Sequence, residues 1–215
     1  MPHSGIEFAP CPGTGVEVCL DTATLHRAMQ MQVLLHSNRW STFVTQLAMV
    51  CVYWQARQVM PWWQAMAWCA PLMLGAAWYF IDSFRFRTAE LITLGSPALQ
   101  HRFLAHVTGQ GFFYGLMYIG IYPHLESQWQ FLLALFAATA IPIGAFTVAA
   151  VQQIGLAWVI SLSLMLTANS LLVGDTLHFF LAAAVVFMGI VSSVSVMSIS
   201  QGLRARLSAE QDARD

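Results

Sequence analysis

All nine basic residues of the chain are arginine, and long apolar stretches divide them unequally. Six such stretches occur, over residues 41–53, 62–81, 103–121, 129–150, 154–173 and 177–199. If the N-terminus lies in the cytoplasm and every stretch crosses a bilayer, eight arginines fall inside and only Arg57 falls outside. Cytoplasmic loops of membrane proteins carry the excess of Lys and Arg. The distribution therefore predicts six spans with both termini cytoplasmic.

The composition agrees with a membrane protein. Hydrophobic residues make up 58% of the 215 residues and charged residues only 9%, whereas a soluble domain has about 25% charged residues. We expect an all-α integral membrane bundle of six transmembrane helices with short loops, embedded in a lipid bilayer. The first stretch is the weakest, because it is short and contains Thr42, Thr45 and Gln46. A net charge of −1 without a basic stripe argues against nucleic acid as a partner.

The segments outside this bundle differ in character. Residues 1–22 are polar and rich in Pro and Gly, which predicts a disordered cytoplasmic tail. Residues 23–39 predict either an amphipathic helix on the membrane surface or a solvated helix leading into the transmembrane domain, residues 40–200. Residues 201–215 predict a cytoplasmic exit helix, with Gly202 as a flexible joint. Leu203 and Leu207 lie four residues apart and could begin a helix–helix seam, so we expect a homodimer.

Neither an enzyme nor a metalloprotein is predicted. No catalytic motif occurs, and we expect no cofactor. The four cysteines form no CxxC pair, so a structural metal site is not expected. His106 and His178 are expected at opposite depths of the membrane, which does not suit the two axial ligands of a membrane haem.

Polar residues inside the spans are the first candidates for a site. His106 and Gln110 are four residues apart and therefore share one helix face. Thr139, Thr147 and others lie in neighbouring spans. Hydrogen bonds between helices would explain these residues. The alternative is a polar pocket in which His106 acts as a ligand or a proton acceptor for a small molecule or an ion.

A second candidate site lies at the outer ends of the spans. Tyr122, His124 and Glu126 follow the third stretch, and Asp175 and His178 begin the sixth. Imidazoles and carboxylates together could bind a divalent metal ion or titrate near neutral pH. Their spacing matches no helical ligand motif, and solvated loop residues are the simpler interpretation. Asp175 would then cap the sixth span.

Small residues at four-residue spacing indicate close helix packing. Gly111 and Gly115 form a GxxxG motif in the third stretch, and Ala140 and Gly144 form a similar pair in the fourth. Such pairs allow two helices to approach closely, either within one chain or between two chains.

The region from Phe103 onward resembles a known type of sensor. It combines an aromatic and Gly-rich span with the segments SQWQFLLALFAATAIPIGAF and LLVGDTLHFFLAAAV and a charged helical end. This pattern, over about half of the chain, resembles the N-terminal membrane sensor region of bacterial multidomain signalling proteins, those with PAS, GGDEF and EAL domains and cyclic di-GMP chemistry, or sensor histidine kinases. The resemblance implies an input module in the bacterial inner membrane, whose catalytic output would lie after residue 215. A small transporter or channel, or an oligomerising membrane scaffold, is the alternative.

Overall fold

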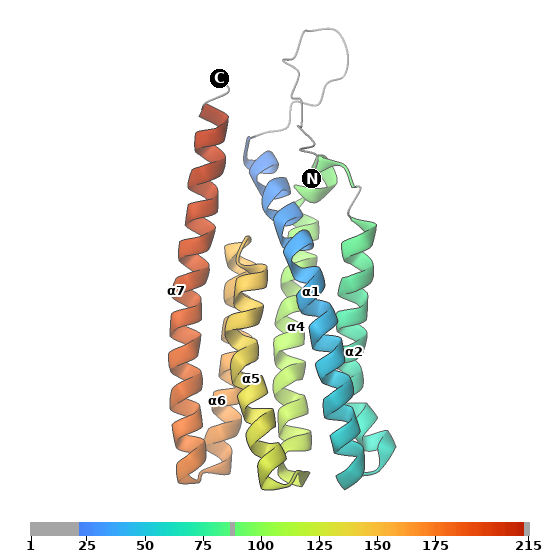
Figure 1. The fold of residues 1–215 in the computed structure, drawn as a ribbon. Helices are drawn as coiled ribbons and strands as arrows, with labels where there is room; N and C mark the ends of the chain where they lie inside the picture. Colours follow the sequence, from blue (N-terminus) through green and yellow to red (C-terminus); the bar gives the residue numbers. More distant parts are fainter. Residues whose placement is uncertain (1–21, 87–88, 213–215) are drawn as a thin grey trace.

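The structure is a bundle of long helices (Figure 1). The computed structural model describes residues 22–86 and 89–212, and every regular element in those residues is helical. The elements are α1 (Thr22–Val59), α2 (Trp62–Arg85), the short α3 (Leu91–Leu94), α4 (Pro97–Ile121), the 3₁₀ turn η1 (Tyr122–His124), α5 (Ser127–Val148), α6 (Gln152–Val173) and α7 (Thr176–Asp212). The predicted disordered tail lies outside the described residues, apart from Thr22.

Five of the long helices enclose a common interior. Contacts run from α1 to α2, α2 to α4, α4 to α6, α6 to α5 and α5 back to α1, while α7 packs on the outside against α5 and α6. The first residues of α1 and the last of α7 lie at one end of the bundle, here called the termini end (Figure 1). The α1–α2 turn, η1 and the α6–α7 turn lie at the opposite end.

Local sequence signals set several helix boundaries. The Ser96 hydroxyl accepts a hydrogen bond from the Leu99 N–H at 3.3 Å, and Pro97 occupies the first turn of α4, as the sequence predicts. Gly174 ends α6 with φ +75°, a left-handed conformation that side chains rarely adopt. The Asp175 carboxylate then accepts the N–H of His178 at 2.8 Å and caps α7.

The first helix differs from the prediction of two separate segments. Residues 23–39 and the first apolar stretch form one continuous helix, α1, because no Gly or Pro interrupts residues 22–59. The start of α1 is also not a free amphipathic helix. Ala28, Met31, Leu34 and Leu35 are buried against residues from α4 and from the α5–α6 turn. This segment therefore continues directly into the rest of α1 and packs one of its faces on protein.

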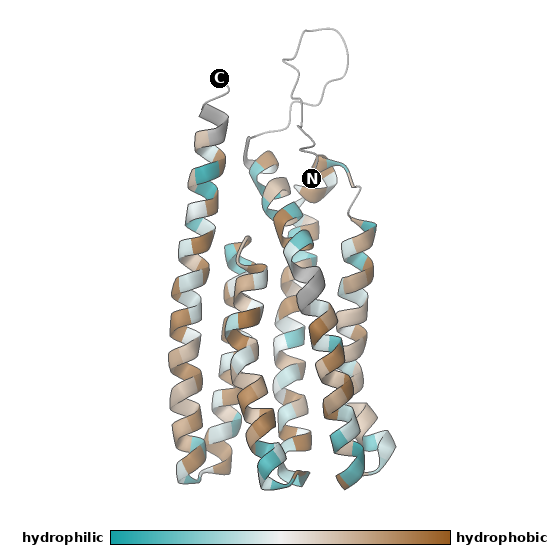
Figure 2. Cartoon of the chain, viewed as in Figure 1, coloured by the Kyte–Doolittle hydropathy of each residue, from teal (hydrophilic) through white to brown (hydrophobic). Residues whose placement is uncertain are grey.

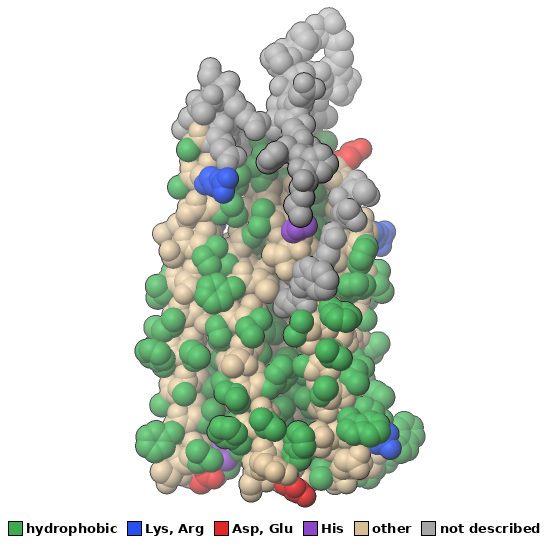
Figure 3. Space-filling view, in the orientation of Figure 1, with side chains coloured by type: hydrophobic (Ala, Val, Ile, Leu, Met, Phe, Trp, Pro, Cys, Tyr) green, Lys and Arg blue, Asp and Glu red, His purple; other side chains and the backbone are tan. Residues whose placement is uncertain are grey.

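The outer surface suits a lipid environment. Four helices, α2, α5, α6 and α7, are long and apolar enough to cross a membrane. Hydropathy is highest along the middle of the helices and lowest at their ends (Figure 2). In the space-filling view, hydrophobic side chains cover the length between charged side chains at the two ends (Figure 3). Large apolar residues such as Leu172, Phe180 and Leu74 are 70–81% exposed. Exposure of this much apolar surface is unfavourable in water but not among lipid acyl chains.

Candidate functional site

A cavity of about 420 Å³ lies inside the ring of five helices. This volume is within the range of about 300–1,000 Å³ that is typical of small-molecule sites. Side chains from α1, α2, α4, α5 and α6 line it, and they include Ser37, Thr42, Thr45, Tyr79, His106, Gln110, Tyr114, Thr139, Thr147 and Trp158. No Asp, Glu, Lys or Arg is among the described residues that line the cavity. The wall of the cavity is therefore mostly apolar, with several polar side chains and no charged side chain among its described residues.

One stripe of α4 supplies the central polar side chains. His106, Gln110 and Tyr114 recur every four residues and all face the cavity. The sequence predicted that His106 and Gln110 share a face, and the structure places Thr139 and Thr147 in the same cavity. Tyr114 was missed, because a tyrosine among apolar residues reads as core. The four-residue spacing was the signal that could have identified it.

Gly75 of α2 makes room for this stripe. A Cβ atom at Gly75 would lie 1.5 Å from Nε2 of Gln110 and 3.5 Å from Cε1 of His106. The Gln110 amide therefore lies directly against the backbone of α2. The ring of Tyr79, also on α2, lies 5.6 Å from the His106 ring, centroid to centroid. These contacts fix two of the three polar side chains of the stripe between α2 and α4.

Tyr114 carries a hydroxyl group without a partner. The residue is 2% exposed, and its hydroxyl oxygen makes no hydrogen bond to the described residues. Its ring contacts Phe136 and Trp158, at centroid distances of 6.0 and 6.3 Å. A buried polar group without a partner costs about 1–3 kcal/mol. Tyr114 lines the cavity, while its hydroxyl oxygen is covered by the surrounding protein.

Trp158 forms the wall on the side of α5 and α6. Its indole N–H donates to the carbonyl oxygen of Ala140 at 3.2 Å. A Cβ atom at Gly144 would lie 2.1 Å from the indole nitrogen, so only glycine leaves space for this ring. Ala140 and Gly144, predicted as a packing pair, thus contact Trp158 of the same chain.

The cavity opens sideways between α1 and α5. Val44 of α1 and Ile143 of α5 both line it, yet they are 59% and 57% exposed on the apolar outer surface. Toward the termini end, the Ser37 hydroxyl donates to the Thr147 carbonyl at 2.7 Å and ties the two helices together. The cavity therefore opens onto the apolar outer surface of the bundle.

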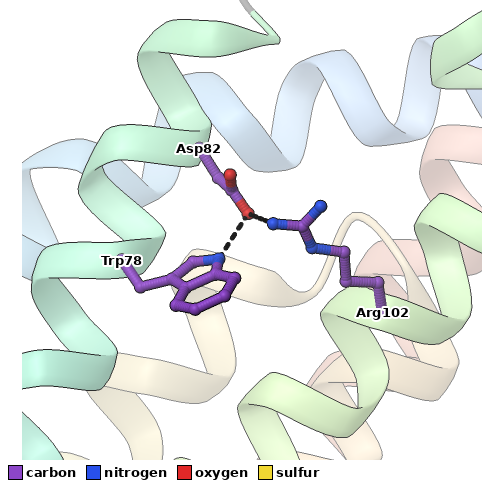
Figure 4. A network of polar contacts seen from close by, with 3 residues as sticks. All are labelled: Trp78, Asp82 and Arg102. Carbon is purple, nitrogen blue, oxygen red and sulfur yellow. Dashed lines mark hydrogen bonds and ion pairs between the residues drawn. The ribbon is translucent and has the colours of Figure 1, made fainter.

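A charged network of Trp78 and Asp82 on α2 and Arg102 on α4 joins these two helices (Figure 4). One oxygen of Asp82 accepts a hydrogen bond from the Trp78 indole at 2.9 Å and forms an ion pair with Arg102 at 2.7 Å. The Asp82 side chain is 8% exposed and that of Arg102 is 42% exposed. Arg102 and His106 are one turn apart on α4, so this network borders the polar stripe without entering the cavity.

The residues of the second candidate site come together only in part. The Nδ1 atom of His178 lies 2.6 Å from the Asp175 carboxylate, and the Tyr122 ring lies 5.2 Å from the His178 ring. His178 is buried, while His124 and Glu126 are exposed. No group of three potential metal ligands occurs in the described part of the chain. Asp175 and His178 therefore form a helix-capping pair.

Acid should weaken this capping pair. The His178 backbone N–H and then its side chain donate to Asp175, and both lower the pKa of the carboxyl group. A carboxyl group whose pKa is lower in the folded than in the unfolded protein stabilises the fold at pH values above its unfolded pKa of about 3.9. This stabilisation is lost as the pH falls through the lower pKa of the folded state. Asp175→Ala should therefore lower the melting temperature at pH 7 and have less effect near pH 3. Equal effects at both pH values in melts of the purified protein would contradict this account.

The GxxxG motif packs against another helix of the same chain. A Cβ atom at Gly111 would meet Ser161 Oγ at 2.0 Å, and one at Gly115 would meet Met165 Cβ at 2.2 Å. Both contacts belong to α6, so the two glycines bring α4 and α6 together.

The predicted exit residues lie on α7, which continues as a helix through Gly202. Leu203 packs against the apolar cluster at the termini end, and Leu207 is half-buried.

Comparison with known proteins adds no assignment. No family, curated protein sequence or solved structure matches the chain.

Proposed function

We propose that the protein is a six-span sensory input module of a bacterial inner membrane. A small molecule would bind in the central cavity, and α7 would carry the resulting change to an output domain after residue 215. The observation that carries the proposal is the cavity itself. Its described lining carries no charged side chain, it opens onto the apolar outer surface, and α5 and α6, the two helices on which α7 packs, form part of its wall.

The positions of the arginines support cytoplasmic termini. Arg27, Arg85, Arg102 and Arg204 lie on the halves of their helices that point to the termini end. Arg57 lies at the opposite end, with its guanidinium carbon 4.6 Å from the centre of the Trp54 ring. Aromatic residues and arginines at such positions are typical of membrane interfaces. The termini end is thus the cytoplasmic end in this proposal. α1 and α4, the first and third spans of the predicted six, would cross the membrane together with the four apolar helices.

A short route leads from the cavity to α7. Trp158 faces the cavity, while Gly155, three residues before it on α6, faces α7, where its Cβ would lie 2.7 Å from Val196. About two turns after Gly155 on α6, Ser163 lies against Gly189 of α7, with 2.8 Å between the Ser163 hydroxyl and a Cβ at that glycine. A molecule that displaced the indole would turn α6 against α7. Contacts this tight tend to switch between discrete packings.

The exit helix provides the output. α7 continues to Asp212, well past the turn between α5 and α6 (Figure 1). Gly202 is exposed, and a Cβ atom there would meet nothing within 4 Å, so no packing contact requires glycine at this position. Because Leu203 packs on its own chain, the proposed homodimer would use Leu207 and the exposed turn beside it.

Filling the cavity should move α7. Ala76 lines the cavity from α2, which is not among the helices that pack on α7. Ala76→Phe should change the distance between spin labels on Ala98→Cys in α4 and Arg206→Cys in α7 by about 1–2 Å. The native cysteines are replaced beforehand, and the distance is measured by electron–electron double resonance in nanodiscs. Ala67→Phe, on the exposed side of α2, is the matched control.

Two results separate the sensor from its alternatives. If the distance between the spin labels in Ala76→Phe equals that of the wild type, filling the cavity does not move α7. The sensor proposal would then lose its mechanical basis, and the scaffold alternative would be favoured. A transporter would instead require the cavity to open to water at both ends in turn. Labelling of Thr139→Cys by a water-soluble maleimide from both sides of the membrane would support that alternative.

A further inference from the structure

Two arginines and a tryptophan lie together on the outer side of α2 and α4, near the termini end. Arg102 of α4 forms an ion pair with Asp82 of α2, and its guanidinium carbon lies 5.4 Å from the centre of the Trp78 ring (Figure 4). Trp78, Asp82 and Arg85 are spaced by four and three residues, so they share one face of α2. The ion pair therefore places Arg102 beside the last turn of α2, which carries Arg85. These four residues are here called the arginine patch.

Much of the hydrogen-bonding capacity of the two arginines is unused. Only the Nη2 atom of Arg102 contacts Asp82, at 2.7 Å, although a guanidinium group carries several N–H donors. Arg85 is exposed and forms no ion pair with a residue in the described part of the chain. Two guanidinium groups and one carboxylate leave the patch with a net charge of +1. The patch thus offers both donors and positive charge to an external anion.

The neighbouring surface of α4 has space for an apolar chain. Gly109, seven residues after Arg102 and about 10 Å from it along the helix, is exposed, and a Cβ atom there would meet nothing within 4 Å. Gly75 of α2 lies against Gln110 of α4. The next residue on α2, Leu74, is 70% exposed and therefore lies at the same level of the bundle as Gly109. An open apolar surface thus begins close to the charged groups.

From this arrangement we infer that the outer surface of α2 and α4 binds an anionic phospholipid. The lipid phosphate lies between the guanidinium groups of Arg85 and Arg102, and one acyl chain runs over Gly109 beside Leu74. The assignment to the cytoplasmic leaflet rests on the proposed topology, whereas binding itself requires only that the bundle crosses a bilayer.

Charge and depth select this kind of lipid. Arginine binds phosphate oxygens through paired N–H groups, and a lipid head with one negative charge neutralises the net charge of the patch. A zwitterionic lipid would bring its ammonium group close to the same guanidinium groups. Trp78 is 58% exposed, and tryptophan is enriched at the level of the lipid head groups. Anionic lipids of the cytoplasmic leaflet are attracted to basic residues at this level.

Photolabelling with defined lipids tests the site. The full chain is placed in phosphatidylcholine nanodiscs with a trace of a phosphatidylglycerol analogue that carries a diazirine and an alkyne on one acyl chain. Labelled peptides should map to the surface around Gly109 and Leu74, and unlabelled phosphatidylglycerol should compete. A phosphatidylcholine analogue with the same chains should label this surface several-fold less. Both analogues should label the exposed face of α7 around Phe187 equally, because that face lies away from the patch.

Two matched variants test the head-group contact. Arg85→Gln removes one positive charge without breaking an ion pair within the described residues, and it should weaken competition by phosphatidylglycerol by about fivefold. Arg204→Gln removes the same charge at the termini end, from an exposed position on α7, which packs against α5 and α6. It should leave the competition unchanged. Arg102 is kept in both variants, because its loss would leave Asp82 without its ion-pair partner.

The outcomes separate this site from the sensory proposal. Equal labelling of the surface around Gly109 by the two analogues, or identical competition in Arg85→Gln and Arg204→Gln, would overturn the lipid assignment. Competition by soluble glycerol phosphate would also overturn it, in favour of a free phosphate compound. Movement of α7 in Ala76→Phe together with any of these results would leave the sensory proposal intact. Selective labelling without movement of α7 would support the lipid site while the signalling role failed.

Discussion

Gly111→Leu is expected to destabilise the bundle by about 3 kcal/mol, at the upper end of the usual cost of overpacking. A Cβ atom at this position would lie 2.0 Å from Ser161 Oγ, 3.0 Å from Ser161 Cβ and 3.2 Å from the Leu162 backbone nitrogen. The serine hydroxyl could rotate away, but the backbone of α6 cannot yield without separating α4 from α6. The α4–α6 contact also closes one side of the central cavity.

Gly109 supplies the control for this prediction. It lies two residues earlier on α4, and a Cβ atom there would meet nothing within 4 Å. Gly109→Leu should change stability by no more than about 1 kcal/mol, in the direction of greater stability, because leucine is the better helix former. Both variants are measured by unfolding in SDS titration. Equal stabilities would show that the close approach at Gly111 is not a fixed feature of the fold.

Local chemistry made two helix starts predictable. Ser96 and Pro97 start α4, and Asp175 caps α7, because capping interactions act within a few residues. The extent of α1 was not predicted. Its polar residues suggested a break near residue 40, but tertiary burial of Met31 and Leu34 stabilises a helix that local hydropathy does not favour. Four apolar helices agree with a membrane bundle, while six spans remain a prediction.

The site was predictable only where its residues share one helix. His106 and Gln110 could be assigned to one face because helical periodicity is local. The opening between α1 and α5 joins residues far apart in the chain, such as Ser37 and Thr147, 110 positions apart, and no local pattern indicates which helices will pair. In the second candidate site, residues that are close in sequence do not come together in the structure. His124 and Glu126 are near Tyr122 in sequence, but the end of η1 leaves them exposed and away from His178.

Removal of Arg102 should destabilise the protein more than removal of its ion-pair partner Asp82. Arg102→Ala leaves a carboxylate that is 8% exposed, with the Trp78 N–H as its remaining donor. Asp82→Ala leaves a guanidinium that is 42% exposed and can be hydrated. Removing one partner of a fully buried pair costs about 3–5 kcal/mol. Because this pair is only partly buried, we expect about 3 kcal/mol for Arg102→Ala and about 1–2 kcal/mol for Asp82→Ala.

The double variant tests the electrostatic origin of this difference. Once Arg102 is absent, removal of Asp82 also removes the unpaired buried charge, so Asp82→Ala/Arg102→Ala should be more stable than Arg102→Ala alone. Glu90→Ala is the control, because this carboxylate is exposed and forms no ion pair with a described residue. Stabilities are compared by SDS titration at constant salt. If the double variant were instead the least stable of the three, the two side chains would contribute by packing, and α2 and α4 would not depend on a charge pair to fix the wall of the cavity.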